Sequence, residues 1–407
     1  MLVTIYLTME SIKQIFRIGY GPSSSHTMGP KRAAGMFLEK NRNANRFQVT
    51  LYGSLAATGR GHLTDKAILQ IMEPHAPTAL IWEPRIHRPF HSNAMLFEAF
   101  DINDKQTDSW EIYSVGGGSL ANETYNEQKE RSVYDMHSIQ EILQWCENGG
   151  YSYWEYVEQQ EGSDIWDYLT EVWEVMQSAI ECGLENEGIL PGGLGLRRKA
   201  VDYLVRAGGY DGSIRTKGMI YAYALAVSEE NACGGRIVTA PTCGSCGVMP
   251  AVLYHLKKSR NFRDSRILRA LATAGLFGNV VKYNASISGA EVGCQGEIGV
   301  ACAMAAAAAN QLFGGSPAQI EYAAEMGLEH HLGLTCDPVE GLVQIPCIER
   351  NAFAASRAFD ASTFAAFSGG IHRISFDQVV EVMRQTGKDI PCLYKETSEG
   401  GLAKIRK

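Results

Sequence analysis

A run of small residues between Asn284 and Arg350 places the strongest constraint on how this 407-residue chain can fold. Residues 298–309 read IGVACAMAAAAA, with alanine at almost every position toward the end. A helix that is apolar on every side has to be buried, and small side chains let neighbouring helices approach closely. We therefore expect this run to form a buried helix surrounded by other helices.

The chain after residue 197 has a helical period and few strand signals. Glycine-rich breaks separate stretches with apolar residues three to four positions apart, at 200–207, 217–229, 249–258, 267–277, 297–312, 317–328, 348–367 and 376–386. This spacing predicts helices, and the glycines predict where they end. We predict an all-α domain over residues 197–407, with the glycines, serines and cysteines in its loops.

Residues 9–130 have a different pattern, which predicts an N-terminal α/β domain. Alternating stretches predict strands at 47–52, 80–82 and 110–115, and helices are expected at 11–20, 31–41 and 63–72, with a loop over 53–61. Residues 131–196 hold four of the six tryptophans, and from residue 132 onward they include no lysine or arginine. This pattern predicts connecting helices that pack against a partner domain or subunit. The expected fold class is α+β, a small α/β domain followed by a mainly all-α catalytic domain.

The composition excludes several classes of function. The net charge is −8, from 37 basic and 45 acidic residues, and without a basic cluster this argues against nucleic acid or an anionic membrane as partner. The longest apolar run, 298–309, is shorter than the roughly 20 residues of a membrane helix. The first residues lack the pattern of a signal peptide. With ten irregularly spaced cysteines, these observations predict a soluble cytoplasmic protein with free thiols.

A polar loop near the start of the chain is the first candidate site. Residues 21–30 read GPSSSHTMGP and precede the helix expected at 31–41. Hydroxyls and free backbone N–H groups at a helix N-terminus suit a small anion such as a carboxylate. The alternative is a capping loop that carries an exposed histidine, His26. The residues alone leave both interpretations open.

Cysteines on loops of the helical domain are the second candidate. Cys294, Cys336 and Cys347 lie next to glycine or proline, or between apolar stretches, with spacings of 336 − 294 = 42 and 347 − 336 = 11. Three thiolates from separate loops suit a [4Fe–4S] cluster with one iron left for substrate. Three packed free thiols are the alternative. Cys302 falls inside the alanine-rich helix and is expected to be buried, and the pair Cys243 and Cys246 is weak evidence for metal or redox chemistry.

Several long motifs, occurring in one order, resemble the iron–sulfur-dependent L-serine dehydratases over nearly the whole chain. GPSSSHTMGP is similar to the signature of that family's β domain. The segments similar to signatures of its α domain are APTCGSCGVMPAVL, NASISGAEVGCQGEIGVACAMAAAAA, GLTCDPVEGLVQIPCIERNAFAASRA and LYKETSEGGLA. The order, β before α, matches the single-chain form of the family.

The resemblance implies an activity and a set of site residues. It implies deamination of L-serine to pyruvate and ammonia at a [4Fe–4S] cluster, with Cys294, Cys336 and Cys347 as the cluster ligands. Ser23, Ser24, Ser25 and Thr27 fall on the loop that faces the substrate, and His26 is the expected base, with Lys395 and Lys282 as alternatives. The β-domain loop is expected to lie over the cluster, in a cleft between the domains. We also expect a homodimer.

The C-terminal segment departs from some members of the family. Those members end in a cysteine that caps the open iron, whereas the last cysteine here is Cys392. We therefore expect water or another small ligand at that iron. Two other functions stay open: a cluster-dependent lyase that acts on cysteine or threonine, and a serine-sensing or redox-sensing protein without catalysis. Sulfide release, or serine binding without pyruvate, would identify them.

Overall fold

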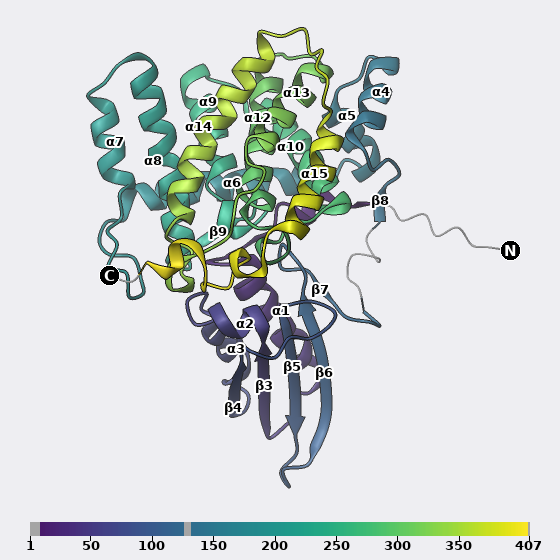
Figure 1. Cartoon of the computed structure of the whole chain (residues 1–407), viewed down its shortest axis with the longest axis vertical. Helices are drawn as coiled ribbons and strands as arrows, with labels where there is room; N and C mark the ends of the chain where they lie inside the picture. The colour runs from purple at the N-terminus through teal and green to yellow at the C-terminus, as the bar shows by residue number, and fades with distance from the viewer. Residues whose placement is uncertain (1–8, 126–131, 406–407) are drawn as a thin grey trace, which may run out of the picture.

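The chain forms two regions of different structure, a helical bundle and a smaller sheet region (Figure 1). A computed structural model describes residues 9–125 and 132–405. The C-terminal segment, yellow in Figure 1, runs along the junction of the two regions. The α+β fold class expected from the sequence is confirmed. Among the described residues, no helix is both long enough and apolar enough to cross a membrane.

The sheet region contains a five-stranded sheet of order β4-β3-β5-β6-β7. Its strands are β3 (Arg46–Tyr52), β4 (Thr78–Glu83), β5 (Ala94–Phe100), β6 (Gln106–Ser114) and β7 (Leu120–Ala121). β3 and β4 are parallel, and the remaining neighbours are antiparallel. The three predicted strands are therefore confirmed as β3, β4 and β6, whereas β5, in the centre of the sheet, was not predicted.

Two helices, α1 (Gly29–Lys40) and α3 (Thr64–Met72), bury the apolar face of this sheet. Alternate residues of β3, among them Val49 and Leu51, are fully buried on that face, as the two-residue period of a strand requires. The loop expected at 53–61 is wrong in its first half, because α2 (Gly53–Thr58) is a short helix. Its sequence, GSLAAT, contains good helix formers that the flanking glycines obscured.

The helical region is built around α12 (Ile298–Leu312). Every residue of α12 except Gln311 is buried, which confirms the buried helix expected from the alanine run. It is surrounded by α9 (Val248–Arg260), α10 (Asp264–Asn284), α13 (Pro317–Glu329) and α14 (Cys347–Ala366). The other predicted helices are confirmed as α7 (Ala200–Gly208), α8 (Gly212–Ala232) and α15 (Phe376–Asp389). A one-turn helix, α11 (Gly289–Val292), and a three-residue strand, β9 (Arg236–Val238), were not predicted.

The helices of residues 139–185 belong to the same core. These are α4 (Ile139–Gly149), α5 (Tyr153–Glu161) and α6 (Ile165–Glu185). Trp173 is buried in the helical core, and Trp145, Trp154 and Trp166 pack against it. The tryptophans of this segment therefore serve packing within the chain.

The first described residues also lie in the helical region. The helix expected at 11–20 is wrong: a 3₁₀ turn (Ile12–Gln14) is followed by strand β2 (Ile18–Tyr20), which pairs with β9. Strand β1 (Met9–Glu10) pairs with β8 (Ser132–Tyr134). Ile12, Ile15 and Phe16 are fully buried in the helical core. Burial of these three side chains outweighs the weak helical period of a ten-residue segment.

An ion pair anchors this N-terminal segment to α10. Lys282 Nζ lies 2.6 Å from Glu10 Oε2, and both side chains are less than a tenth exposed. Lys282 is therefore held by Glu10 in a buried ion pair. Removing one partner of a buried pair leaves the other charge without compensation.

We expect Lys282→Met to lower the free energy of unfolding by about 3–5 kcal/mol for this reason. Denaturant titration measures the change. The double variant Glu10→Gln/Lys282→Met should recover most of the loss, because it removes both charges. A loss as large in the double variant would mean that packing, and not the ion pair, accounts for the effect.

Candidate active site

The polar loop predicted from the sequence forms a tight turn that leads into α1. Residues Ser24–Met28 make a π-helical turn, and the Ser23 hydroxyl accepts a hydrogen bond from the backbone N–H of His26 (3.1 Å). Short π-helical segments occur frequently at functional sites. All five residues of SSSHT are buried, so the alternative of a capping loop with an exposed histidine is wrong.

The hydroxyls of this turn differ in the hydrogen bonds that they form. Thr27 Oγ1 accepts a hydrogen bond from the Ser23 N–H (3.1 Å) and donates one to the carbonyl of His62 (2.6 Å). Its proton is therefore used within the protein and is not available to a ligand. Ser25 Oγ lies 3.0 Å from Nδ1 of His26. The hydroxyl of Ser24 has no hydrogen-bond partner within residues 9–125 and 132–405. The hydroxyl of Ser24 is thus the one best placed to donate to a ligand, because the Ser25 hydroxyl already bonds to His26.

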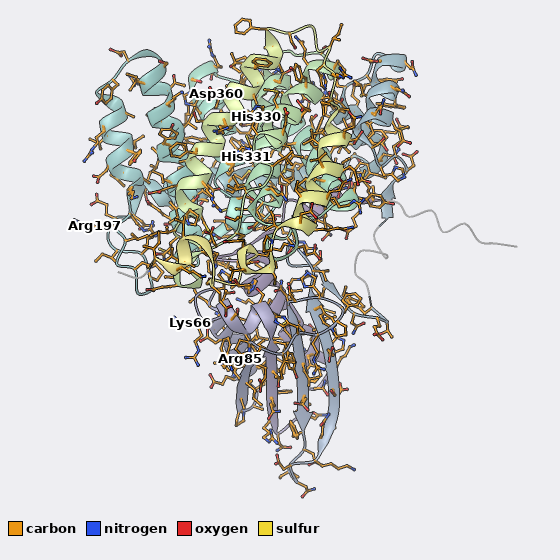
Figure 2. The ribbon with its side chains drawn as sticks, in the orientation of Figure 1. Lys66, Arg85, Arg197, His330, His331 and Asp360 are labelled. Atoms are coloured by element: carbon orange, nitrogen blue, oxygen red, sulfur yellow. The ribbon has the colours of Figure 1, made fainter. Side chains whose placement is uncertain are left out.

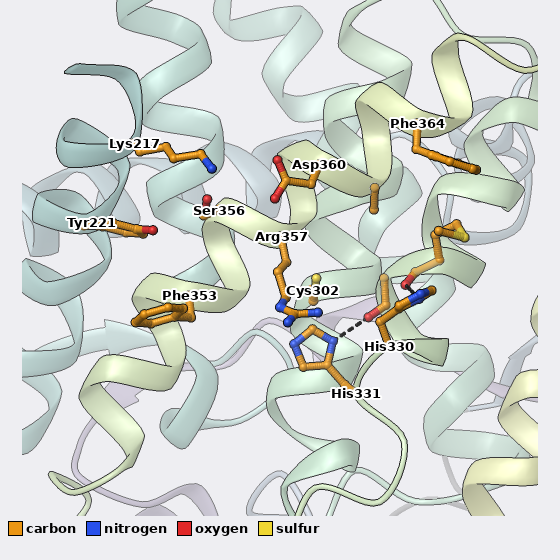
Figure 3. A pocket seen from close by; sticks show the side chains of 13 residues that line it. Lys217, Tyr221, Cys302, His330, His331, Phe353, Ser356, Arg357, Asp360 and Phe364 are labelled. Atoms are coloured by element: carbon orange, nitrogen blue, oxygen red, sulfur yellow. Dashed lines mark hydrogen bonds between the residues drawn. The ribbon is translucent and has the colours of Figure 1, made fainter. Parts of the chain in front are cut away.

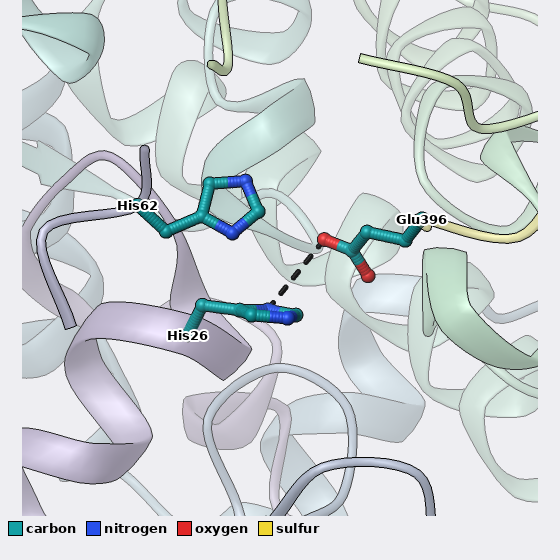
Figure 4. Close-up of side chains that lie close together, drawn as sticks. All are labelled: His26, His62 and Glu396. Atoms are coloured by element: carbon teal, nitrogen blue, oxygen red, sulfur yellow. Dashed lines mark ion pairs between the residues drawn. The ribbon is translucent and has the colours of Figure 1, made fainter. Parts of the chain in front are cut away.

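Three buried side chains, His26, His62 and Glu396, come together at the end of this turn (Figure 4). One ring nitrogen of each histidine and one carboxylate oxygen of Glu396 lie within 4.8 Å of one another. The two imidazole rings meet edge to face with their centroids 4.5 Å apart. Nδ1 of His26 lies 3.6 Å from Oε1 of Glu396. Residues from the two ends of the chain therefore build one polar cluster.

The hydrogen bonds around the two imidazoles assign their tautomers. Ser54 Oγ donates to the carbonyl of Glu396 (3.1 Å), so it accepts from Nε2–H of His26 (3.0 Å). Thr58 Oγ1 donates to the carbonyl of Ser54 (3.0 Å), so it accepts from Nδ1–H of His62 (3.2 Å). Each hydroxyl has a single proton to donate, which fixes both directions.

The consequence is a difference between the two histidines. In His26 the Nδ1 lone pair is taken up by the Ser25 hydroxyl. In His62 the unprotonated nitrogen is Nε2, which has no hydrogen-bond partner in the described part of the chain. Burial lowers the pKa of His62 to about 3, and burial followed by the neighbouring His62 lowers the pKa of His26. Both rings are therefore neutral at pH 7, and His62 has the free lone pair.

The lowered pKa of His62 predicts a pH dependence of stability. The unfolded chain binds a proton at this residue near pH 6.5, whereas the folded protein resists it down to about pH 3. Stability from this site is fully present above pH 6.5 and is lost progressively as the pH falls toward 3. We expect the melting temperature of the native protein to fall more steeply between pH 7 and pH 4.5 than that of His62→Gln. Parallel slopes in a thermal-shift series would contradict this.

The three loop cysteines lie on separate segments of the helical region. Cys294 begins a 3₁₀ turn (Cys294–Gly296), Cys336 follows α13, and Cys347 is the first residue of α14. All ten cysteines are free thiols. The Sγ atoms of Cys294 and Cys336 and a carboxylate oxygen of Glu297 lie within 4.8 Å of one another. The sulfur of Cys347 is close enough for the charge of Cys294 to raise its pKa, in addition to the larger effect of burial.

The electrostatics at these cysteines favour one thiolate. A hydrogen bond from the Cys336 thiol lowers the pKa of Cys294, and the positive charge of Arg350 adds to this against the effect of burial. Arg350 is itself held by the carbonyl of Thr335 (2.7 Å) and by Asp337 (3.6 Å). A guanidinium beside free thiols is the environment in which thiolates form and bind soft metals.

The residues present fit a [4Fe–4S] cluster. Cys294 and Cys336 lie within reach of one metal ion, Cys347 is close enough for Cys294 to affect its pKa, and none of the three forms a disulfide. A Cβ atom at Gly289 would lie 3.1 Å from the sulfur of Cys336 and 2.8 Å from Oε2 of Glu297, so the backbone approaches this donor set where only glycine fits. Soft thiolate donors on irregular segments are the usual ligands of iron–sulfur clusters.

The two groups of residues form one site at the junction of the sheet and helical regions. The backbone N–H of Glu396 donates to the carbonyl of Cys336 (2.7 Å), and Cys336 N–H donates to the carbonyl of Tyr394 (2.8 Å). Residues 394–396 thus carry Glu396 from the cysteines to the two histidines. Burial, and then the charges of Glu297 and Cys294, raise the pKa of Glu396. The site combines a set of soft metal donors with a neutral base.

A close approach of backbone segments holds this junction together. A Cβ atom at Gly61 would lie only 2.6 Å from the carbonyl oxygen of Gly341, on the loop between Cys336 and Cys347. We expect Gly61→Ala to cost about 1–3 kcal/mol of stability, because the two segments must separate, and to lower activity at the junction. Denaturation and steady-state assays measure the two effects.

Gly35→Ala is the matched control for this prediction. Gly35 lies in α1, and a Cβ atom there would meet nothing within 4 Å. Replacing a helical glycine in open space should stabilise by about 0.5–1 kcal/mol. If Gly61→Ala were as stable and as active as Gly35→Ala, the close approach of the two backbone segments would not be needed for stability or activity.

Part of this site was predicted from the sequence. His62, Glu396 and Arg350 were not predicted, although Glu396 lies in the motif LYKETSEGGLA. Cys302 is fully buried on α12, as expected. Cys243 and Cys246 are fully buried as well, and Cys243 contacts Met28 through sulfur (3.5 Å). A signal for His62 was present only as a lone histidine between glycine and leucine, which by itself indicates no chemistry.

Comparison with known proteins gives the family of the chain. The family model described as the serine dehydratase beta chain matches residues 11–80, and the serine dehydratase alpha chain matches residues 94–403. The alpha-chain match thus begins at strand β5, inside the sheet. Both parts are present in one polypeptide, in the order expected from the motifs.

Full-length relatives agree with the family models. The chain is 42% identical to an L-serine dehydratase of Streptomyces coelicolor, over 97% of this chain and 98% of the relative. It is 42% identical to an L-serine dehydratase of Escherichia coli, over 97% of this chain and 99% of the relative. It is 38% identical to the L-serine dehydratase of Helicobacter pylori, over 98% and 99%. The chain therefore belongs to the single-chain L-serine dehydratase family and is an enzyme of that family.

Proposed function

We propose that this enzyme converts L-serine to pyruvate and ammonia by α,β-elimination of water. The observation that carries the proposal is the backbone link, through residues 394–396, between Cys336 of the cysteine group and Glu396 of the His26–His62–Glu396 cluster. The names of the full-length relatives support serine as the substrate. Elimination yields an aminoacrylate, which tautomerises and hydrolyses in water to pyruvate and ammonia.

Cys294, Cys336 and Cys347 would hold a [4Fe–4S] cluster. When bound, such a cluster with one iron free of thiolate supplies a Lewis acid for the hydroxyl group of serine. The Cys336 thiol and Arg350 lower the pKa of Cys294 and so favour its thiolate, whereas burial raises the pKa of Cys347. Glu297, whose carboxylate accepts a hydrogen bond from Thr242 Oγ1 (2.7 Å), closes the site beside the sulfurs.

The turn of residues 23–27 would bind the amino acid. Ser24 has a hydroxyl that can donate to the substrate carboxylate, and α1 begins directly after the turn, with its positive end toward the site. Ser23 and Thr27 hold the turn in shape through hydrogen bonds within it and to the His62 carbonyl. We therefore assign the carboxylate contact to Ser24, and a positioning role to Ser23 and Thr27, whereas the Ser25 hydroxyl donates to Nδ1 of His26.

His62 is our proposed general base, in place of the His26 expected from the sequence. A base needs a free lone pair within reach of the proton, and Nε2 of His62 has one, whereas Nδ1 of His26 is occupied by Ser25. An imidazole whose pKa is near 3 is a weak base until a counter-charge stabilises its protonated form. Glu396 lies in the same cluster, and although its surroundings raise its pKa, its ionised carboxylate would supply that charge. His26 would orient His62 and the Ser25 hydroxyl.

The experiment that tests the function is an anaerobic reconstitution followed by product analysis. The reconstituted protein is incubated separately with L-serine, L-threonine and L-cysteine. We expect pyruvate and ammonia in equal amounts from L-serine, at a higher kcat/KM than for the other two. Preferred release of sulfide from cysteine, or serine binding without pyruvate, would contradict the proposal.

We further propose that the enzyme is a homodimer in the cytoplasm. We also propose that its β-type domain spans residues 9–130, that connecting helices span 131–196, and that its α-type domain spans 197–407. The burial of 139–185 in the helical core supports treating the last two as one folding unit. Light scattering of the purified enzyme tests the dimer.

A further inference from the structure

A pocket of about 470 Å³ opens on the helical region, outside the site described above (Figure 3). Its walls come from α8, α13 and α14, and Cys302 of α12 lies at its floor. The volume lies within the range of sites that bind small molecules. Phe353 and Tyr221, whose rings stack with centroids 5.8 Å apart, form one apolar side.

Three charged side chains of this pocket are available to a ligand. Arg357, Lys217 and Asp360 make no hydrogen bond or ion pair within residues 9–125 and 132–405. The guanidinium of Arg357 points inward, toward His331 and Cys302, while Lys217 and Asp360 face each other across the opening (Figure 3). All three side chains are exposed, so the guanidinium of Arg357 is free to form charge-assisted hydrogen bonds with an anion that enters the pocket.

The balance of charge and geometry defines the ligand class. Arg357 presents a planar fork that suits a carboxylate or phosphate group, and Lys217 adds a second positive charge at the rim. Asp360 accepts hydrogen bonds and so favours a ligand that also carries a hydroxyl or amino group. Burial, followed by the smaller effect of the Arg357 charge, lowers the pKa of His331 to about 4, so its neutral ring adds no positive charge.

Each of the three segments that carry the site cysteines contributes a residue to this pocket. Cys302 follows Cys294 by 302 − 294 = 8 positions, and its helix, α12, begins four residues after that cysteine. His331 precedes Cys336 by 336 − 331 = 5 positions. Arg357 follows Cys347 by 357 − 347 = 10 positions along α14, about 15 Å of helix. A ligand that joins these residues therefore acts on the backbone that positions the cysteines.

We propose that this pocket is an effector site for a small metabolite carrying a carboxylate or phosphate group, with Arg357 as its anchor. Occupation fixes the end of α13 against α14 and so changes serine turnover at the junction. The effect on turnover rests on the proposed function, whereas binding of the anion does not. The two parts can therefore fail separately.

Calorimetry on the reconstituted full chain tests binding, with inorganic phosphate and malonate as the two probes. We expect one saturable site per chain for at least one probe, with the stronger probe showing which anionic group the pocket prefers. Arg357→Ala should weaken binding about tenfold or more, and Lys217→Ala to a smaller extent. Arg85→Ala is the matched control, because Arg85 is an exposed arginine on the sheet region, far from His330, His331 and Asp360 (Figure 2).

Steady-state assays then test the effector role. At a saturating concentration of the probe, we expect KM or kcat for L-serine to change on the order of fivefold in the native enzyme and in Arg85→Ala, and to stay constant in Arg357→Ala. Absence of saturable binding, or equal binding by Arg357→Ala, would overturn the site. Binding that leaves the kinetics of serine turnover unchanged would overturn its role as an effector site.

Discussion

Cys336→Ala is expected to lose both the iron–sulfur cluster and the elimination activity. Cys336 lies between the other elements of the site: its sulfur is grouped with Cys294 and Glu297, and its backbone binds the segment that carries Glu396. Two remaining thiolates cannot hold a cluster that needs three. Because Lewis-acid assistance is worth several kcal/mol, we expect kcat to fall about 10³-fold or more. Iron and sulfide analysis with a pyruvate assay measures both losses.

Cys146→Ala is the control for this experiment. Cys146 is a buried free cysteine on α4, far in sequence from the three site cysteines. Its replacement should leave the iron content and kcat near the native values, and circular dichroism should show both variants folded. A Cys336→Ala protein that kept its iron and its turnover would remove Cys336 from the ligand set.

His62→Gln is expected to lower kcat for L-serine by about 10²–10⁴-fold, the usual contribution of a positioned general base. KM should change little, because the serine hydroxyls of the turn remain in place. His26→Gln should instead raise KM more than it lowers kcat, since His26 orients Ser25 and the neighbouring ring. Steady-state kinetics of both variants, over a range of pH, separates the two roles.

An exposed histidine, His75, provides the control substitution. His75→Gln lies outside the cluster and should leave kcat and KM unchanged. The assignment of the base would be reversed if His62→Gln turned over serine at the native rate while His26→Gln lost activity. That outcome would return the role of base to His26, as the motif alone suggested.

Much of the helical region is predictable from the sequence. Helices such as α12 and α14 are long, and their apolar or small residues repeat with a clear period, so local signals and burial agree. Strand β5 lacks such agreement, because AMLFEAF has apolar residues on both faces and no alternation. The 3₁₀ turn at Ile12 depends on contacts with α10, far away in the sequence, which no local pattern reveals.

The site was predictable only where a motif carried it. The resemblance chose Cys294, Cys336 and Cys347 among ten cysteines, and the structure brings the first two within reach of one ligand. His62 and Glu396 are isolated in the sequence and come together through the fold, across 396 − 62 = 334 positions. Their roles follow from hydrogen-bond directions and burial, which require coordinates.

Mössbauer spectroscopy of the ⁵⁷Fe-reconstituted enzyme, with and without L-serine, tests the central claim most directly. The claim is that serine meets an open iron of a three-cysteine cluster, beside the two histidines. We predict one iron subsite distinct from the others in the resting enzyme, and a change confined to that subsite when L-serine is added anaerobically. Four thiolate-ligated irons that do not respond to L-serine, in a preparation that still forms pyruvate, would contradict the account.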